Sequence, residues 1–253
     1  RRRSRGRQRA GQDHRWPTVT TWRAIRIAAL SWLSAMPPAV GAAQNATVPT
    51  VPAGALPDGI HLDGVLDEPA WIAADAIDNL VQTDPSEGAP PTGKTIVRVL
   101  AGATAILIGI VCEDPDPSGI VSFSVRRDAA LGSEDHVRVV LGPFLDGRSG
   151  YVFAVNPSGA RYDGIINPGG ESDNPEWDGI WEAATRRSPA GWSVEVWIPI
   201  HTLSFKADLR QWHFNVQRRI QRTLETDRWA SPARQYQVTQ TSRAGLLTGL
   251  PQF

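Results

Sequence analysis

The sequence predicts a single antiparallel β-sandwich, and three observations support this fold class. Beyond residue 57 the chain holds short runs rich in Val, Ile and aromatic residues, Gly, Pro, Asn and Asp separate these runs, and helical periodicity is weak. The runs are Thr95–Leu100, Ala105–Cys112, His136–Leu141, Tyr151–Asn156, Ala160–Ile166, Ile180–Thr185, Trp192–Ile198 and Trp212–Ile220. We therefore expect one all-β domain over residues 58–250, without a second domain or an internal repeat.

The run Trp212–Ile220 shows most clearly why strands are expected. Apolar residues occupy one face and polar residues the other, as in a strand whose inner face is packed. The apolar face holds Trp212, Phe214, Val216 and Ile220, and the polar face holds His213, Asn215, Gln217 and Arg219. Short helices are expected only at Glu68–Ala76 and His201–Phe205.

The start of the chain is typical of an export leader. Residues 1–43 carry nine Arg and a single acid, Asp13. An apolar run, Ile25–Met36, is followed by the small residues Gly41–Ala43, which predicts a signal peptide cleaved after Ala43. The run is shorter than the roughly 20 residues that span a bilayer, and a buried amphipathic helix is the alternative. Residues 44–57, rich in Pro, Ala and Thr without periodicity, are predicted to be a linker.

The charge of the remaining chain argues against a nucleic-acid partner. Nine of the 26 basic residues and one of the 26 acidic residues lie before residue 44, which leaves 17 basic and 25 acidic residues and a charge near minus eight. A body of this sign repels a phosphate backbone. The single cysteine, Cys112, lies in an apolar run and is predicted to be a core residue.

The sequence gives no sign of catalysis. It has no nucleophile elbow, zinc-protease helix, phosphate-binding loop or dinucleotide fingerprint, and its five His lack metal-ligand spacing. Glycoside hydrolysis needs two carboxylates that face one cleft. The acidic residues in the loops are expected to be solvated rather than catalytic. Glu195, between two valines, is predicted to be a structural acid paired with Arg218 or Arg219.

Several segments, in order, resemble one known family. Residues 63–71 read Asp-Gly-Val-Leu-Asp-Glu-Pro-Ala-Trp; we expect a turn at Asp63-Gly64, Leu66 and Trp71 over the end of the sandwich, and a capping role for Asp67. Further segments are Arg127-Asp128, Glu134–Val137, Phe153–Gly159, Trp177–Glu182, Gly191–Glu195 with Ile198-Pro199, and Trp229–Pro232. Together they resemble the family 9 carbohydrate-binding modules across roughly residues 58–250. The resemblance implies a non-catalytic sandwich that binds a glycan or oligosaccharide and serves carbohydrate catabolism, in some proteins alongside O-glycosyl hydrolases.

A sub-group of this family stands at the N-terminus of long bacterial proteins, before a predicted outer-membrane β-barrel. Residues 242–250 are similar to the junction between those two parts. This implies export to the periplasm or outer membrane of a Gram-negative bacterium, with a downstream barrel as a partner. A structural periplasmic domain without a ligand is the alternative. A haem-binding sandwich is a weaker one, because the only Met is Met36 in the leader.

The resemblance also implies site residues. It places a sugar-stacking Trp at Trp229, with Trp177 as a second candidate, and Arg138, Asp227 and Arg228 as polar contacts. The second Trp of the family's clamp is missing from residues 126–135, and Arg138 stands where those members tend to carry a carboxylate. We therefore expect an affinity no tighter than about millimolar, or about 4 kcal/mol.

No cofactor is expected, apart from a structural calcium ion. Calcium takes oxygen ligands from loops, and related modules bind it. The candidate ligands are Asp114, Asp116, Glu171 and Asp173.

Overall fold

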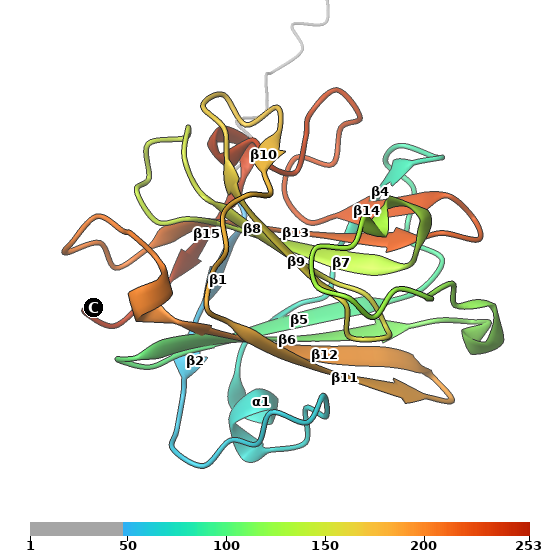
Figure 1. Cartoon of the computed structure of the whole chain (residues 1–253), viewed down its shortest axis with the longest axis horizontal. Helices are drawn as coiled ribbons and strands as arrows, with labels where there is room; N and C mark the ends of the chain where they lie inside the picture. The colour runs from blue at the N-terminus through green and yellow to red at the C-terminus, as the bar shows by residue number, and fades with distance from the viewer. Residues whose placement is uncertain (1–47) are drawn as a thin grey trace, which may run out of the picture. The chain divides into compact units, whose positions relative to one another are not determined.

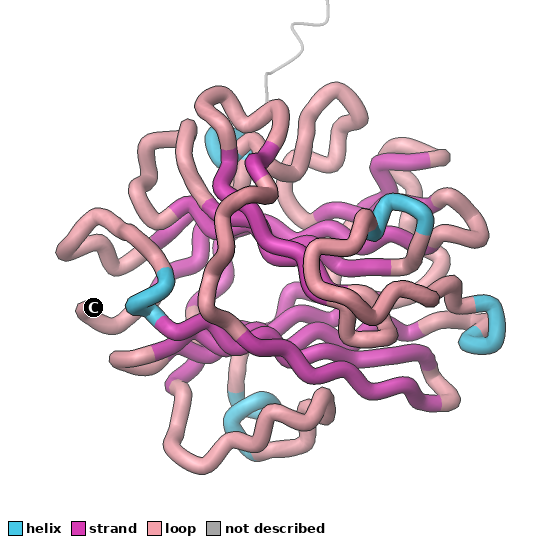
Figure 2. The backbone as a smooth tube through the Cα atoms, in the orientation of Figure 1, coloured by secondary structure: helices cyan, strands magenta, loops and turns pink. Residues whose placement is uncertain are grey.

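The computed structural model describes residues 48–253, which form two β-sheets packed face to face (Figures 1 and 2). The predicted all-β sandwich is confirmed, and the predicted leader lies outside the described residues. The nine-stranded sheet has the order β1 (Thr50–Pro52), β15 (Gly245–Thr248), β13 (Trp212–Ile220), β7 (His136–Gly142), β8 (Tyr151–Val155), β9 (Arg161–Ile166) and β10 (Asp173–Asn174), with β14 (Glu225–Arg228) between β13 and β4 (Val81–Asp84). The six-stranded sheet has the order β11 (Glu182–Ser188), β12 (Gly191–Pro199), β6 (Ala105–Glu113), β5 (Thr95–Ala101) and β2 (Gly54–Ala55), with β3 (Ala76–Ile77) also paired to β5.

Helices within the described residues are short. They are α1 (Pro69–Ala73) and the 3-10 turns Pro117–Gly119, Leu131–Ser133, Ile200–Thr202 and Thr241–Arg243. The expected helices at 68–76 and 201–205 thus correspond to α1 and to the turn at 200–202.

Two strands lie where the sequence predicted a linker. β1 pairs in parallel with β15, and β2 pairs in parallel with β5, so the sandwich is antiparallel except at these two edges. Strands of two or three residues cannot show a period-two pattern, which is why residues 50–55 read as a linker. The described residues, 48–253, belong to one compact unit.

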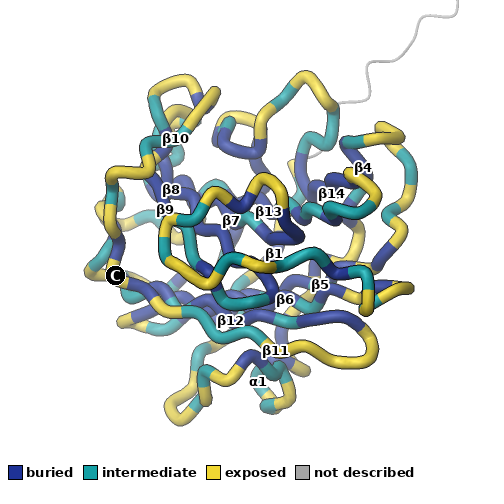
Figure 3. The backbone as a smooth tube through the Cα atoms, turned by 45° about the vertical axis from the view of Figure 1, so that its right-hand side comes forward, coloured by how far each residue is buried: buried dark blue, intermediate teal, exposed yellow. Residues whose placement is uncertain are grey.

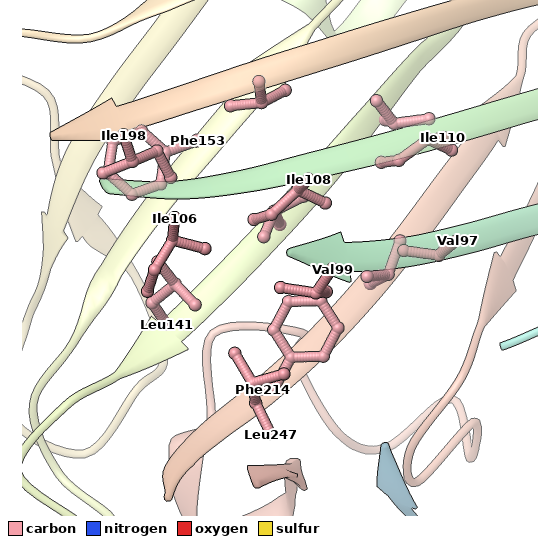
Figure 4. Packing of buried hydrophobic residues seen from close by; sticks show 14 of the residues in the cluster. Val97, Val99, Ile106, Ile108, Ile110, Leu141, Phe153, Ile198, Phe214 and Leu247 are labelled. Atoms are coloured by element: carbon pink, nitrogen blue, oxygen red, sulfur yellow. The ribbon is translucent and has the colours of Figure 1, made fainter. Parts of the chain in front are cut away.

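The core lies between the two sheets. Trp212, Phe214 and Val216 are fully buried on the inner face of β13, as their alternation predicted. Figure 4 shows side chains of the two sheets meeting, among them Val99 from β5 and Leu141 from β7, and the burial colours of Figure 3 follow the central strands. Burying this apolar area is the main stabilising contribution.

Cys112 belongs to the same core cluster, as predicted. Its side chain is fully buried, and burial raises the pKa of its thiol to about 11. The thiol therefore stays protonated and behaves as a small apolar side chain.

The opening motif covers the outer face of the six-stranded sheet, the side away from the other sheet, rather than the end of the sandwich (Figure 1). Leu66 and Trp71 lie over Gly109 in β6, where a Cβ would come within 2.4 Å of the Leu66 side chain and 2.9 Å of the Trp71 ring. Only glycine leaves room for both. The N-cap of α1 is Glu68, without a side-chain capping bond, so Asp67 does not take the capping role that was expected.

A buried carboxylate fastens this motif to the sheet. Glu195 in β12 accepts hydrogen bonds from the backbone N–H of Asp63 (3.0 Å) and Gly64 (2.9 Å) and from the Trp71 indole N–H (3.2 Å). Burial raises the pKa of Glu195. Glu195 is thus a structural acid, as predicted, but its partners are amides and an indole rather than an arginine.

Candidate functional site

A row of polar side chains crosses the outer face of the nine-stranded sheet. Arg138 in β7 pairs with Gln217 in β13, and Gln217 pairs with Arg228 in β14. On the other side, Ala154 in β8 pairs with both Arg138 and Tyr162 of β9. The neighbouring residues of β7 and β13 face the core, so these polar side chains face outward. Tyr162, Arg138, Gln217 and Arg228 are called the polar row below.

Tyr162 and Asp173 hold Arg138 in place. The Arg138 guanidinium lies 5.6 Å from the centroid of the Tyr162 ring, and its Nη1 is 3.9 Å from Asp173 Oδ1. The Tyr162 hydroxyl donates a hydrogen bond to the other oxygen of Asp173. The Arg138 side chain is 28% exposed, and its N–H groups donate no hydrogen bond to any residue in the described part of the chain. Arg138 is therefore positioned while its donors stay free.

Arg228 fixes the orientation of the Gln217 amide. Its Nε and Nη2 donate to Gln217 Oε1 at 3.3 and 3.0 Å, and its Nη1 donates to the carbonyls of Ser231 (3.3 Å) and Tyr236 (2.8 Å). Burial lowers the pKa of Arg228. Because a guanidinium only donates, the Gln217 oxygen must face Arg228. The two N–H donors of Gln217 Nε2 are then directed away from Arg228.

A second row lies beside the first. Arg219 in β13 pairs with His136 of β7 and with Thr226 of β14. Arg219 donates to Thr226 Oγ1 (3.1 Å) and to the Leu224 carbonyl (2.8 Å). His136 Nδ1 lies 2.9 Å from the Glu134 carbonyl, and burial lowers the pKa of His136 to about 4. His136 is therefore neutral at pH 7, between two charged arginines.

Two loops pack onto the same outer face. Leu131, in the 3-10 turn before β7, packs against Ala154 and Ala160. Val238, in the loop after β14, packs in a cluster with Val140 and Val152. The ring of Tyr162 packs against both clusters. This packing fixes the strands that carry the polar row.

Trp229, predicted as a stacking residue, lies on the inner side of the sheet. It is 7% exposed, its ring meets Phe214 edge-on at 5.9 Å, and a Cβ on Gly245 would come within 2.4 Å of it. Its remaining exposed edge lines a pocket of about 460 Å³ formed with residues 49–52 and 75–79. This position gives Trp229 the contacts of a core residue, and we leave it out of the proposed contact surface.

Trp177 is also directed away from the polar row. It lies between β10 and β11, with its ring 4.7 Å from Tyr151 and 6.1 Å from Phe153, and it packs against the core. A Cβ on Gly179 would come within 2.7 Å of the Trp177 ring. These contacts fix the ring at the open edge of the sandwich.

Asp227 has no exposed surface, so it too falls outside the contact surface. It lies across the strand pair from Arg218, a fully buried arginine. Arg218 Nη1 donates at 3.2 Å to Thr95 Oγ1 and to the carbonyls of residues 93 and 94, so it links the two sheets. Burial, and then the negative charge of Glu225, raise the pKa of Asp227 to about 7.

The four calcium candidates already have other partners or lie exposed. Asp114 accepts two hydrogen bonds from Arg222, at 2.8 and 2.5 Å. Burial alone would raise the pKa of Asp114, but these bonds hold it below its usual value. Asp116 accepts from Ser118, Asp173 is bonded to Tyr162, and Glu171 is exposed. No group of three or more His, Cys, Asp or Glu among residues 48–253 is arranged to hold a metal ion.

Of the five predicted contacts, the structure places two in the polar row, the partly exposed Arg138 and the buried Arg228, which reaches a ligand only through Gln217. It also adds residues that the sequence analysis did not choose. Gln217 and Arg219 were assigned to the polar face of their strand, but no sequence signal paired that face with β7 and β14. Tyr162 carried no separate signal. Among the described residues, no helix is long and apolar enough to cross a membrane.

Several solved structures resemble this fold, among them two modules and a third protein. A family 9 carbohydrate-binding module from Caldicellulosiruptor kristjanssonii in complex with cellotriose matches with a TM-score of 0.59 at 13% identity, over 81% of this chain and 95% of that chain. The same kind of module from that organism, in complex with glucose, matches with a TM-score of 0.59 at 12% identity, over 81% and 97% of the two chains. A candidate carbohydrate-binding protein from Bacteroides uniformis ATCC 8492 matches with a TM-score of 0.63 at 12% identity, over 80% and 99%.

No protein-family profile and no curated protein matches the sequence. At such low identity the structural likeness shows the fold alone. The chain therefore has the fold of a family 9 carbohydrate-binding module.

Proposed function

We propose that this chain is an exported, non-catalytic module that binds a glycan or oligosaccharide through the polar row. The observation that carries the proposal is the set of free donors on Arg138 and Gln217, held in fixed positions on an accessible face. Sugar recognition needs polar groups at set spacings around a ring of hydroxyls. The likeness to modules that hold cellotriose and glucose supports this function.

Export, to the periplasm or outer membrane of a Gram-negative cell, is part of the proposal and rests on the leader sequence. A downstream β-barrel and a role in carbohydrate catabolism rest on the family resemblance of the sequence.

Binding can be tested by isothermal titration of the purified chain with a panel of neutral and acidic oligosaccharides. We expect affinities near millimolar, about 4 kcal/mol. The substitution Gln217→Ala should weaken binding by about 1 kcal/mol, the typical contribution of one hydrogen bond. It also removes the acceptor of two hydrogen bonds from buried Arg228 and should lower the melting temperature, so the titration is run well below the transition of the variant. Arg186→Ala, at an exposed position on β11 of the other sheet, is the matched control and should bind like the wild type. Failure of every glycan to bind would favour the structural-domain alternative.

A further inference from the structure

The polar row offers many hydrogen-bond donors and few acceptors. The five N–H groups of Arg138 and the amide N–H groups of Gln217 donate to no residue in the described chain, whereas Gln217 Oε1 is already taken by Arg228. One oxygen of Asp173 is taken by the Tyr162 hydroxyl, and the other faces Arg138. A ligand bound here would therefore be offered many hydrogen-bond donors and almost no free hydrogen-bond acceptor.

The same face carries an excess of positive charge. Arg138, Arg219 and Arg228 lie within two neighbouring rows. Two carboxylates lie near them: Asp173, 3.9 Å from Arg138, and Asp84, which acts on Arg228 but is ion-paired with Arg234. Neither Arg219 nor Arg228 forms an ion pair with a described acid. Residues 44–253 as a whole carry 17 basic against 25 acidic residues. Arg138 and Arg219 therefore form a cationic surface on an otherwise acidic body, with the buried charge of Arg228 beside them.

No aromatic face in the row is free for a sugar to stack on. The Tyr162 ring has the Arg138 guanidinium beside it and packs against two apolar clusters. A neutral sugar would gain little stacking here, and each of its hydroxyls would find a donor without a matching acceptor. A carboxylate fits better, because it only accepts and because arginine binds it through two parallel hydrogen bonds.

From this arrangement we infer that the module selects acidic glycans, with a uronate carboxylate bound to Arg138 and a neighbouring sugar oxygen bound to the Gln217 amide. This inference rests on the proposed function and names its ligand class. Arg219 adds a second positive charge beside the carboxylate. Tyr162 and Asp173 are positioning residues that hold the Arg138 guanidinium.

The test is a comparison of four ligand sets by isothermal titration of the full chain. These are oligogalacturonate, the same oligosaccharide with its carboxyl groups reduced to alcohols, neutral cello- and xylo-oligosaccharides, and a sulfated oligosaccharide. We expect oligogalacturonate to bind at least about tenfold more tightly than its reduced form, about 1.4 kcal/mol. This preference should weaken as salt is added, because the attraction between charges is screened.

Protein variants give a second arm. Arg138→Gln should weaken binding of every glycan and should reduce the preference for oligogalacturonate over its reduced form from about tenfold to less than about twofold. Arg186→Gln, at an exposed position on the other sheet, should keep both the affinity and the preference. The reduced oligosaccharide tests the inference on the wild-type chain, even where a variant fails to fold. Equal binding of acidic and reduced forms, or a preference for the sulfated ligand, would overturn the uronate inference and leave the proposed function standing. Absence of binding to all four sets would overturn both.

Discussion

Substitution of Asp227 by Asn should change how the stability of the module depends on pH. Asp227 is fully buried, and its pKa of about 7 compares with 3.8 for an exposed aspartate, a difference that corresponds to about 4 kcal/mol. The folded state keeps this proton up to about pH 7, whereas the unfolded state releases it near pH 4. The wild-type free energy of unfolding therefore falls as pH rises from about 4 to about 7, and the contribution is constant above that range. Asparagine has no proton to lose, so the variant lacks this fall.

The assay is urea unfolding, followed by tryptophan fluorescence, of the wild type and Asp227→Asn between about pH 5 and 8. The variant should gain stability relative to the wild type as pH rises through this range, by about 3 kcal/mol. Asp58→Asn, at an exposed position, is the control and should show no such trend. Glu225→Gln removes the neighbouring negative charge, so the pKa of Asp227 should fall. In this variant the pH-dependent fall in the free energy of unfolding should therefore end at a lower pH than in the wild type. A difference between variant and wild type that does not change with pH would refute the reasoning.

Two further predictions concern buried side chains. Trp71→Ala should lower the free energy of unfolding by about 3–5 kcal/mol, because Trp71 is 1% exposed and bonded to Glu195; a loss below about 1 kcal/mol in urea unfolding would contradict the packing described for the opening motif. His136, whose pKa burial lowers to about 4, should make the wild type less stable as pH falls from about 6.5 towards 4, by about 3 kcal/mol, because the unfolded state binds the proton first. His136→Gln should remove this loss, opposite in sign to the effect of Asp227→Asn, and an unchanged pH profile would show that His136 does not titrate as inferred.

The long strands could be predicted from sequence because each has enough residues to show its alternation. Trp212–Ile220 was predicted with the bounds that β13 has in the structure. The short strands could not be predicted, and β14 shows a second reason. Its sequence, Glu-Thr-Asp-Arg, is typical of a solvated loop, yet Glu225 and Asp227 face the interior. Buried Arg218 lies beside them, and a polar strand inside a sandwich has no hydrophobic pattern to reveal it.

The candidate site was only partly predictable for a related reason. Arg138 and Arg228 were chosen from a family resemblance, while Gln217, which lies between them, was known only as the polar side of a strand. Their neighbourhood depends on the pairing of β13 with β14, a strand that the sequence analysis did not predict, and with β7, which lies far earlier in the sequence. A period-two pattern gives the face of a residue within its strand but not its partner in the next strand.

The pairing of β1 with β15 has a consequence for how the chain acquires its structure. The first strand described, Thr50–Pro52, pairs only with Gly245–Thr248. One edge of β13 also stays partly unpaired until Gly245–Thr248 have been synthesised. A ribosome must therefore release nearly the whole module before the larger sheet can close. Contacts of such sequence separation make folding slow, so a nascent chain stays open for longer than one built from local hairpins. Under the export proposed above, the chain would cross the membrane as an extended thread, and that delay would be an advantage.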